Sequence, residues 1–192
     1  TNVNGLVSVG FTWAGLSTNA NQFLGVPLSI KTGVVVTNLV NYGDAIRSET
    51  AGISSFKAGS NAVASGDMST SVGIGSTAAK DFAIAIGPSA NVTGTGLYGI
   101  AIGPSAAASA PYGIGIGSLA NARQTNSIAI GQAAYSAYHE SVAVGAFTTN
   151  WGDFGTALGH GARSTNLSTA VGHGTDASGY GSLALGKGTK SS

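Results

Sequence analysis

The stretch Asn126-Ser-Ile-Ala-Ile-Gly-Gln-Ala-Ala134 decides the fold, because versions of it recur along most of the chain. A repeat of this kind has to be recognised before any other pattern is interpreted. Its pentad Ser127–Gly131 belongs to the series SVGIG, AIAIG, GIAIG, GIGIG, SIAIG, SVAVG, GTALG, STAVG and SLALG. The closing glycines, from Gly75 to Gly186, are 12, 16, 14, 14, 14, 14, 13 and 14 residues apart. Two variable residues and then Ala or Thr follow each glycine, and a weaker copy stands at Gly59–Ala62.

A period of fourteen residues limits what each repeat can be. It is too short for a helix with its connections, but it holds two short strands and two tight turns. Each repeat is therefore predicted to be one β-coil, and the array from about Gly75 to Gly186 a stack of such coils.

Alternation within the pentad assigns its residues to two faces. The first and third residues before the glycine are mostly Ile, Val or Leu and are predicted to form the core of the coil. The residue between them is Ala or Gly, which predicts a second face buried at close range against another chain. Identical columns favour a closed, rotationally symmetric assembly. The predicted trimer interface consists of Ala85, Ala101, Ala129, Ala143, Ala157, Ala170 and Ala184.

The pentad followed by G-x-x-A resembles the head repeats of the YadA-like trimeric autotransporter adhesins, with Asn126–Gly131 as the nearest copy. The resemblance implies an all-β fold in which a left-handed parallel β-roll packs side by side as a homotrimer. Such repeats also occur on phage proteins, so the resemblance specifies the fold more closely than the biology.

Residues 1–56 do not carry the repeat and are predicted to form a small β-rich docking module, with the roll over residues 57–192. Leu28–Val36 is strand-like and Asn41–Asp44 favours a turn. This pattern loosely resembles small β-modules of phage head-decoration and fibre proteins. It suggests attachment to a larger particle such as a capsid or fibre base.

Composition excludes several classes of function. The formal charge of +1 and the absence of Lys- and Arg-rich stretches argue against nucleic-acid binding. The absence of cysteine excludes disulfides and thiolate chemistry, and no segment predicts membrane insertion. Gly181–Lys187 has the spacing of a phosphate-binding loop, but Gly188 stands where Ser or Thr belongs. We predict no catalytic residue, no cofactor and no metal site, hence no enzyme.

Recognition is expected in the turns, which the repeat leaves free to vary. The candidate ligand rim consists of Trp151, Tyr135, Tyr138, His160 and His173. The two histidines follow closing glycines in consecutive coils, where a solvated surface is favoured over a metal site.

Phe82, Tyr98 and Tyr112 share one repeat position. There they form either a packing ladder or a stacking strip for sugar rings.

Two functions follow as hypotheses. The first is a homotrimeric structural protein of the virion exterior, a cement, decoration or fibre-head protein. The second is a bacterial adhesin head on the outer-membrane surface that binds matrix proteins, glycans or other surfaces.

Overall fold

The computed structural model describes residues 2–3, 6–7 and 52–192, and the chain divides into two units, 1–40 and 41–192. In the first unit, β1 (Asn2–Val3) pairs antiparallel with β2 (Leu6–Val7). Apart from these strands and residues 52–56, the predicted docking module 1–56 lies outside the described residues.

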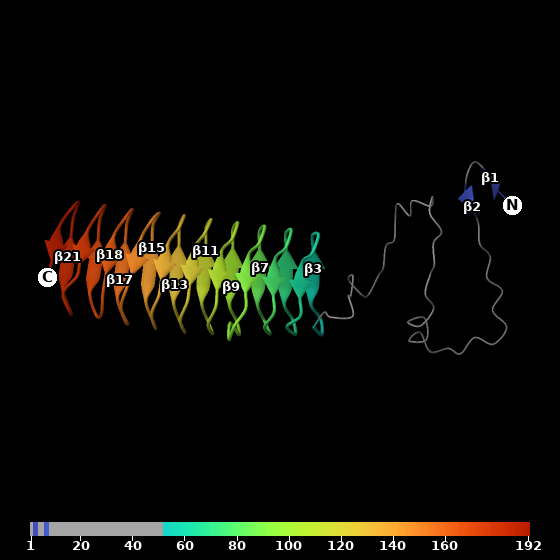
Figure 1. Ribbon diagram of the computed structural model, residues 1–192, viewed down its shortest axis with the longest axis horizontal. Coiled ribbons are helices and arrows are strands. Elements are labelled where there is room, and N and C mark those ends of the chain that lie inside the picture. The colour runs from blue at the N-terminus through green and yellow to red at the C-terminus, as the bar shows by residue number, and fades with distance from the viewer. Residues whose placement is uncertain (1, 4–5, 8–51) are drawn as a thin grey trace. The chain divides into compact units, whose positions relative to one another are not determined.

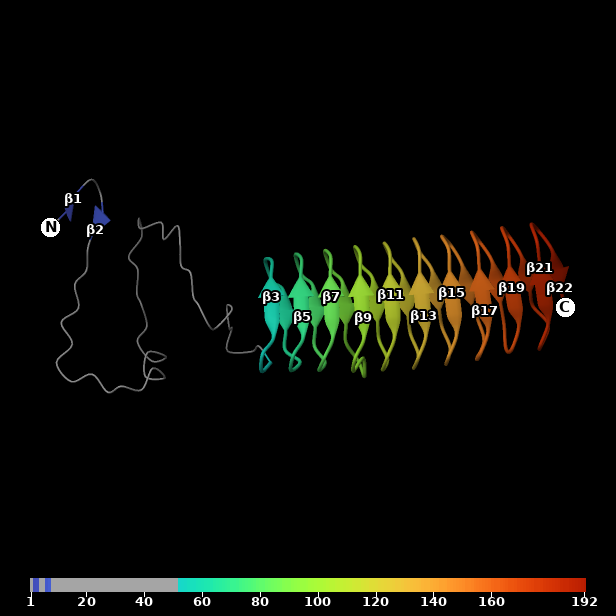
Figure 2. The same ribbon diagram turned by 180° about the vertical axis from the view of Figure 1, so that it is seen from behind.

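The second unit is a β-solenoid in which every coil contributes one strand to each of two parallel sheets (Figures 1 and 2). The long-strand sheet contains β3 (Phe56–Ala58), β5 (Thr70–Val72), β7 (Ile84–Ile86), β9 (Ile100–Ile102), β11 (Ile114–Ile116), β13 (Ile128–Ile130), β15 (Val142–Val144), β17 (Thr156–Leu158), β19 (Thr169–Val171) and β21 (Leu183–Leu185). The short-strand sheet contains β4 (Val63–Ala64), β6 (Thr77–Ala78), β8 (Asn91–Val92), β10 (Ala107–Ala108), β12 (Asn121–Ala122), β14 (Tyr135–Ser136), β16 (Thr149–Asn150), β18 (Arg163–Ser164), β20 (Asp176–Ala177) and β22 (Lys190–Ser191). The predicted all-β parallel solenoid of fourteen-residue coils is confirmed.

The register of the sheets corrects the start of the array. Ser71 in β5 pairs with Ala85 in β7, so Gly73, and not Gly75, is equivalent to Gly87. The backbone agrees, because φ is 134° at Gly73 and 127° at Gly87 but 64° at Gly75. The closing glycine of this repeat therefore lies two residues earlier than predicted. Pairing of β3 with β5 also shows that the stack already includes Phe56.

The two faces of the pentad are the reverse of those predicted. The middle residue points into the coil, and the flanking aliphatic residues point out, as the burial pattern of β13 shows for Ala129 between Ile128 and Ile130. The residues predicted at the trimer interface are all buried inside a single chain, namely Ala85, Ala101, Ala129, Ala143, Ala157, Ala170 and Ala184. Because no partner can reach them, the prediction that chains meet through these alanines is wrong.

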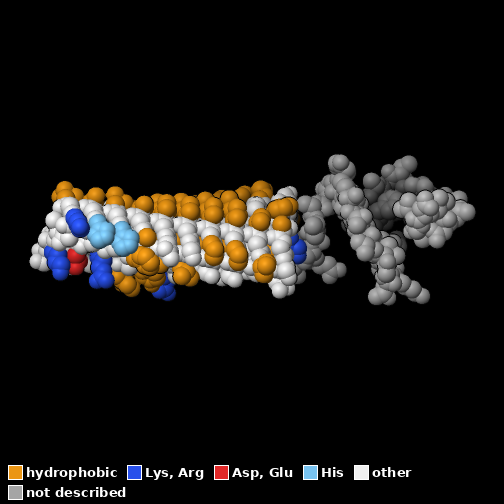
Figure 3. Space-filling model, turned by 90° about the horizontal axis from the view of Figure 1, so that it is seen from above, with side chains coloured by type: hydrophobic (Ala, Val, Ile, Leu, Met, Phe, Trp, Pro, Cys, Tyr) orange, Lys and Arg blue, Asp and Glu red, His pale blue; other side chains and the backbone are white. Residues whose placement is uncertain are grey.

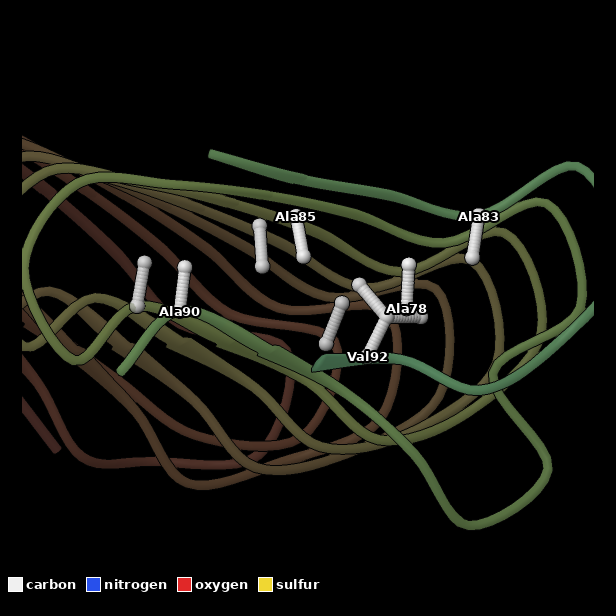
Figure 4. Packing of buried hydrophobic residues seen from close by; sticks show 8 residues of the cluster. Ala78, Ala83, Ala85, Ala90 and Val92 are labelled. Atoms are coloured by element: carbon white, nitrogen blue, oxygen red, sulfur yellow. The ribbon is translucent and has the colours of Figure 1, made fainter. Parts of the chain in front are cut away.

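The core is thin, and this explains the reversal. Ala85 of β7 and Ala83 just before it point toward Ala78 and Val92 of the short-strand sheet (Figure 4), and the buried hydrophobic residues of the solenoid are all alanine apart from Val92. Two sheets packed this closely leave space for Ala, Ser, Thr and Gly, so bulkier aliphatic residues are accommodated only outside. The larger Val92 fits because Gly99 faces it, where a Cβ would lie 2.8 Å from the Val92 Cγ1.

The closing glycines are required by the stacking of the coils. At Gly131 φ is 129°, and a Cβ would lie 2.5 Å from the carbonyl oxygen of Gly145 in the next coil. The same closeness recurs at Gly117, where the Cβ would meet the carbonyl oxygen of Gly131. Neither the dihedral angle nor the space allows another residue.

Differences in coil length are confined to one of the two turns. Two residues always separate the closing glycine from the small residue that follows, as between Gly131 and the buried Ala134. The turn from the short-strand sheet to the long-strand sheet varies: the interval is nine residues from Val92 to Ala101 and six from Ser164 to Ala170, but seven elsewhere. We call this the variable turn.

Candidate functional site

The outer face of the long-strand sheet is an aliphatic surface that one chain leaves partly exposed. Hydrophobic side chains follow one edge of the solenoid along its length in Figure 3. We define this aliphatic face by the outward residues Val72, Ile84, Ile86, Ile100, Ile102, Ile114, Ile116, Ile128, Ile130, Val142, Val144, Leu158, Val171, Leu183 and Leu185. These residues come from nine strands, β5 to β21, and at a spacing of about 4.8 Å they make the face about 38 Å long.

The outer face of the short-strand sheet has a different chemistry. Its outward column is mostly polar or small, and it consists of Val63, Thr77, Asn91, Ala107, Asn121, Tyr135, Thr149, Arg163, Asp176 and Lys190. Such a face is compatible with water, whereas the aliphatic face is not. The solenoid therefore has one side suited to a partner and one suited to solvent.

The structure brings two residues of the candidate rim together beside the variable turn. The ring centroids of Tyr135 and Trp151 lie 5.0 Å apart, with the ring planes inclined by 45°. The guanidinium Nη1 of Arg123 donates a hydrogen bond of 2.6 Å to the Tyr135 hydroxyl. This hydrogen bond raises the pKa of Arg123, so the side chain stays charged. The Trp151 ring is thus supported on one side by Tyr135, which Arg123 holds in turn.

On its other side, Trp151 borders a depression of about 230 Å³ that is lined also by Thr165, Asn166, Ser178 and Tyr180. Trp151 is 53% exposed and Tyr180 is 79% exposed. The lining comes from three consecutive coils and includes no charged side chain. We call this depression the Trp151 slot.

The other candidate rim residues lie apart from the slot. His160 and His173 follow closing glycines, on the turn opposite the variable turn, where their rings stack at 5.0 Å and Phe147 meets the ring of His160 edge-on at 5.6 Å. Tyr138 is exposed, and its main-chain carbonyl accepts a hydrogen bond from the Ser141 hydroxyl.

Phe82, Tyr98 and Tyr112 form a continuous stack in the variable turns of three coils. Their ring centroids are separated by 4.7 and 5.2 Å, and the ring planes are nearly parallel. Because the rings cover one another face to face, their faces are not free for a ligand, and the packing ladder is the better interpretation. Each of the three has φ between 57° and 59°.

Within residues 52–192 and the two N-terminal strands, no three His, Cys, Asp or Glu side chains gather where they could hold a metal ion. The same residues include no helix long and apolar enough to cross a membrane.

Four residues that line the slot are not among the predicted site residues, namely Tyr180, Asn166, Thr165 and Ser178. Thr165 and Ser178 follow Trp151 in consecutive coils and could have been found by extending the repeat from it. Tyr180 could not, because it lies three residues after the buried Ala177, whereas Trp151 directly follows the buried Asn150, so the two occupy different repeat positions.

The comparisons with known proteins agree with the architecture. A family model described as the YadA head domain repeat (2 copies) matches residues 64–90, 95–117, 108–134 and 166–189. No curated protein matches the chain. The matched segments lie within the stacked coils and contain their pentads and closing glycines. The part of the solenoid between residues 64 and 189 therefore carries YadA head domain repeats.

Proposed function

We propose that the solenoid is the head of a homotrimeric, surface-exposed adhesin, and that its three chains pack through the aliphatic face. YadA-like heads form homotrimers in general. The observation that carries the proposal for this chain is the contrast between its two outer faces, one aliphatic over nine strands and the other mostly polar or small.

Physical considerations support the assignment of the interface. A continuous aliphatic surface of this length is unfavourable in water. Covering the remaining exposed part of one Ile or Val side chain contributes about 1 kcal/mol, and each coil supplies up to two such residues per chain. Three identical flat faces turned toward a common axis cover one another and leave the polar faces in solvent. The thin core then gains a second apolar layer between the chains.

The proposed role is attachment, without catalysis. The side chains that differ from coil to coil lie in the turns and on the polar face, and they include the half-buried Tyr135 and the exposed aromatic groups of Trp151 and Tyr180. Exposed aromatic side chains beside polar groups are typical of binding surfaces.

The family match supports an extracellular, surface-exposed location, and within it we propose the bacterial outer-membrane surface. The alternative, a virion exterior, was predicted from residues 1–56, which lie almost entirely outside the described residues. Antibodies raised against residues 57–192 distinguish the two by labelling either intact cells or purified virions.

The interface is tested on the full chain by replacing Ile128 and Ile130 with Glu. Six carboxylates buried near the axis of a trimer are not tolerated, so sedimentation should change from trimer to monomer. The control carries Asn91→Glu and Asn121→Glu on the polar face and should remain trimeric. The proposal is wrong if the parent protein is monomeric, or if the Ile variant remains a trimer with an unchanged melting temperature.

A further inference from the structure

We infer that the Trp151 slot is a binding site for a neutral saccharide, with one sugar ring held between Trp151 and Tyr180. This inference rests on the proposed attachment function and names the chemistry that the head recognises. The slot belongs to a single chain, so it can be tested separately from the trimer.

The chemistry of the lining matches a sugar ring. A saccharide presents apolar C–H faces together with hydroxyl groups around its edge. Trp151 and Tyr180 offer exposed aromatic surface to such faces. Thr165, Asn166 and Ser178, which lie between them, supply hydroxyl and amide groups for the edge. Because none of these five residues is charged, a neutral ligand is favoured over an ionic one.

The polar groups of the slot are positioned by the fold and remain available. The Asn166 Oδ1 accepts a hydrogen bond of 2.9 Å from the backbone N–H of Asp153, which leaves the amide nitrogen as the part of the side chain that can donate to a ligand. The Thr165 hydroxyl has only long contacts, of 3.2 to 3.5 Å, with carbonyl oxygens of the next coil. A ligand hydroxyl can replace contacts of this length at little cost.

The spacing of the coils leaves room for one ring between the two aromatic side chains. Trp151 and Tyr180 come from coils two steps apart, which corresponds to about 10 Å along the axis at a spacing of about 4.8 Å per coil. A sugar ring in van der Waals contact with both aromatic groups needs about 7 to 8 Å. Sites that enclose drug-sized ligands have volumes of roughly 300 to 1,000 Å³. The smaller volume of the slot, about 230 Å³, fits a ligand as small as one sugar ring.

Trp151 is also held in position before any ligand arrives. Tyr135 packs against it at 5.0 Å, and Arg123 anchors the Tyr135 hydroxyl. A supported aromatic wall loses little conformational freedom on binding. In the proposed trimer the slot occurs three times, so weak single contacts add up on a surface dense in glycans.

The test uses the full chain with Trp13→Phe, which leaves Trp151 as its one tryptophan. Tryptophan fluorescence is titrated with glucose, galactose, mannose, N-acetylglucosamine and the tetrasaccharides built from them. We expect a saturable change with at least one of these sugars. Calorimetry should then show binding weakened about tenfold or more by Trp151→Ala and by Tyr180→Ala, the size of effect that loss of an aromatic stacking partner produces.

Phe154→Ala is the matched control, because Phe154 is a similarly exposed aromatic residue of the variable turns that does not line the slot. It should bind sugar like the parent. Absence of binding to every sugar by a protein that sediments as a trimer overturns the saccharide site and leaves the proposed head intact. Equal binding by parent, Trp151→Ala and Tyr180→Ala overturns it as well.

Discussion

Replacing Gly131 with Ala should destabilise the solenoid severely, although it adds a single methyl group. At φ 129° an L-residue is strained by about 1 to 3 kcal/mol. The added Cβ would also lie 2.5 Å from the carbonyl oxygen of Gly145, and such overpacking costs about 1 to 3 kcal/mol more. We expect a loss of about 4 kcal/mol per chain, which for a domain of this size lowers the melting temperature by roughly 10 °C or more.

Gly161 provides the matched control, because its φ is 64° and a Cβ there would meet nothing within 4 Å. Alanine in this left-handed conformation costs about 1 to 2 kcal/mol, and the less flexible unfolded chain offsets part of that. Urea unfolding followed by circular dichroism compares both variants with the parent. If Gly131→Ala and Gly161→Ala lose the same stability, the close approach between successive coils does not determine the need for glycine.

Two further substitutions test the core and the aromatic ladder. Ala129→Leu should destabilise the fold by about 2 kcal/mol or more because the thin core has no room for a longer side chain, whereas Ala137→Leu, at a partly exposed position, should be nearly neutral in the same urea titration. Tyr98→Ala removes the stacking on both Phe82 and Tyr112 and should cost about 1 to 3 kcal/mol in thermal unfolding; an unchanged melting temperature would mean that the ladder contributes no packing energy.

The fold was predictable from the sequence because a fourteen-residue period leaves few alternatives. Two short strands and two turns per repeat lead directly to a parallel stack, and Asn126–Gly131 matches the family pattern nearly letter for letter. The start of the array was harder to locate, since Gly73 and Gly75 both fit a closing glycine. The pairing of Ser71 with Ala85 and the backbone dihedral angles of the two glycines distinguish them.

The orientation of the pentad could not be obtained from hydrophobicity. Aliphatic residues usually mark the interior, and Ile128 and Ile130 were assigned there for that reason. In this fold the interior is too thin for them, so Ala129 lies inside and the isoleucines lie outside. Alternation of side chains identifies two faces, but the distance between the sheets decides which of them is the core.

The candidate site was predictable in part. A cluster of aromatic residues around Trp151 and Tyr135 followed from the position of both residues in neighbouring coils, and the two rings are in contact. Tyr180 was not predictable in this way, because it occupies a different repeat position from Trp151, three residues after the buried Ala177.

Because of the variable turn, the residues that stack the coils are not the residues that are free to vary at the surface. Two residues are added between Val92 and Ala101 and one is removed between Ser164 and Ala170, yet the strands on either side stay in register. Loops can therefore be lengthened, shortened or exchanged at this edge while the stacking of the coils is preserved. A lineage that carries this head can change what it recognises without redesigning the rod, and a protein engineer can graft new peptides at the same points.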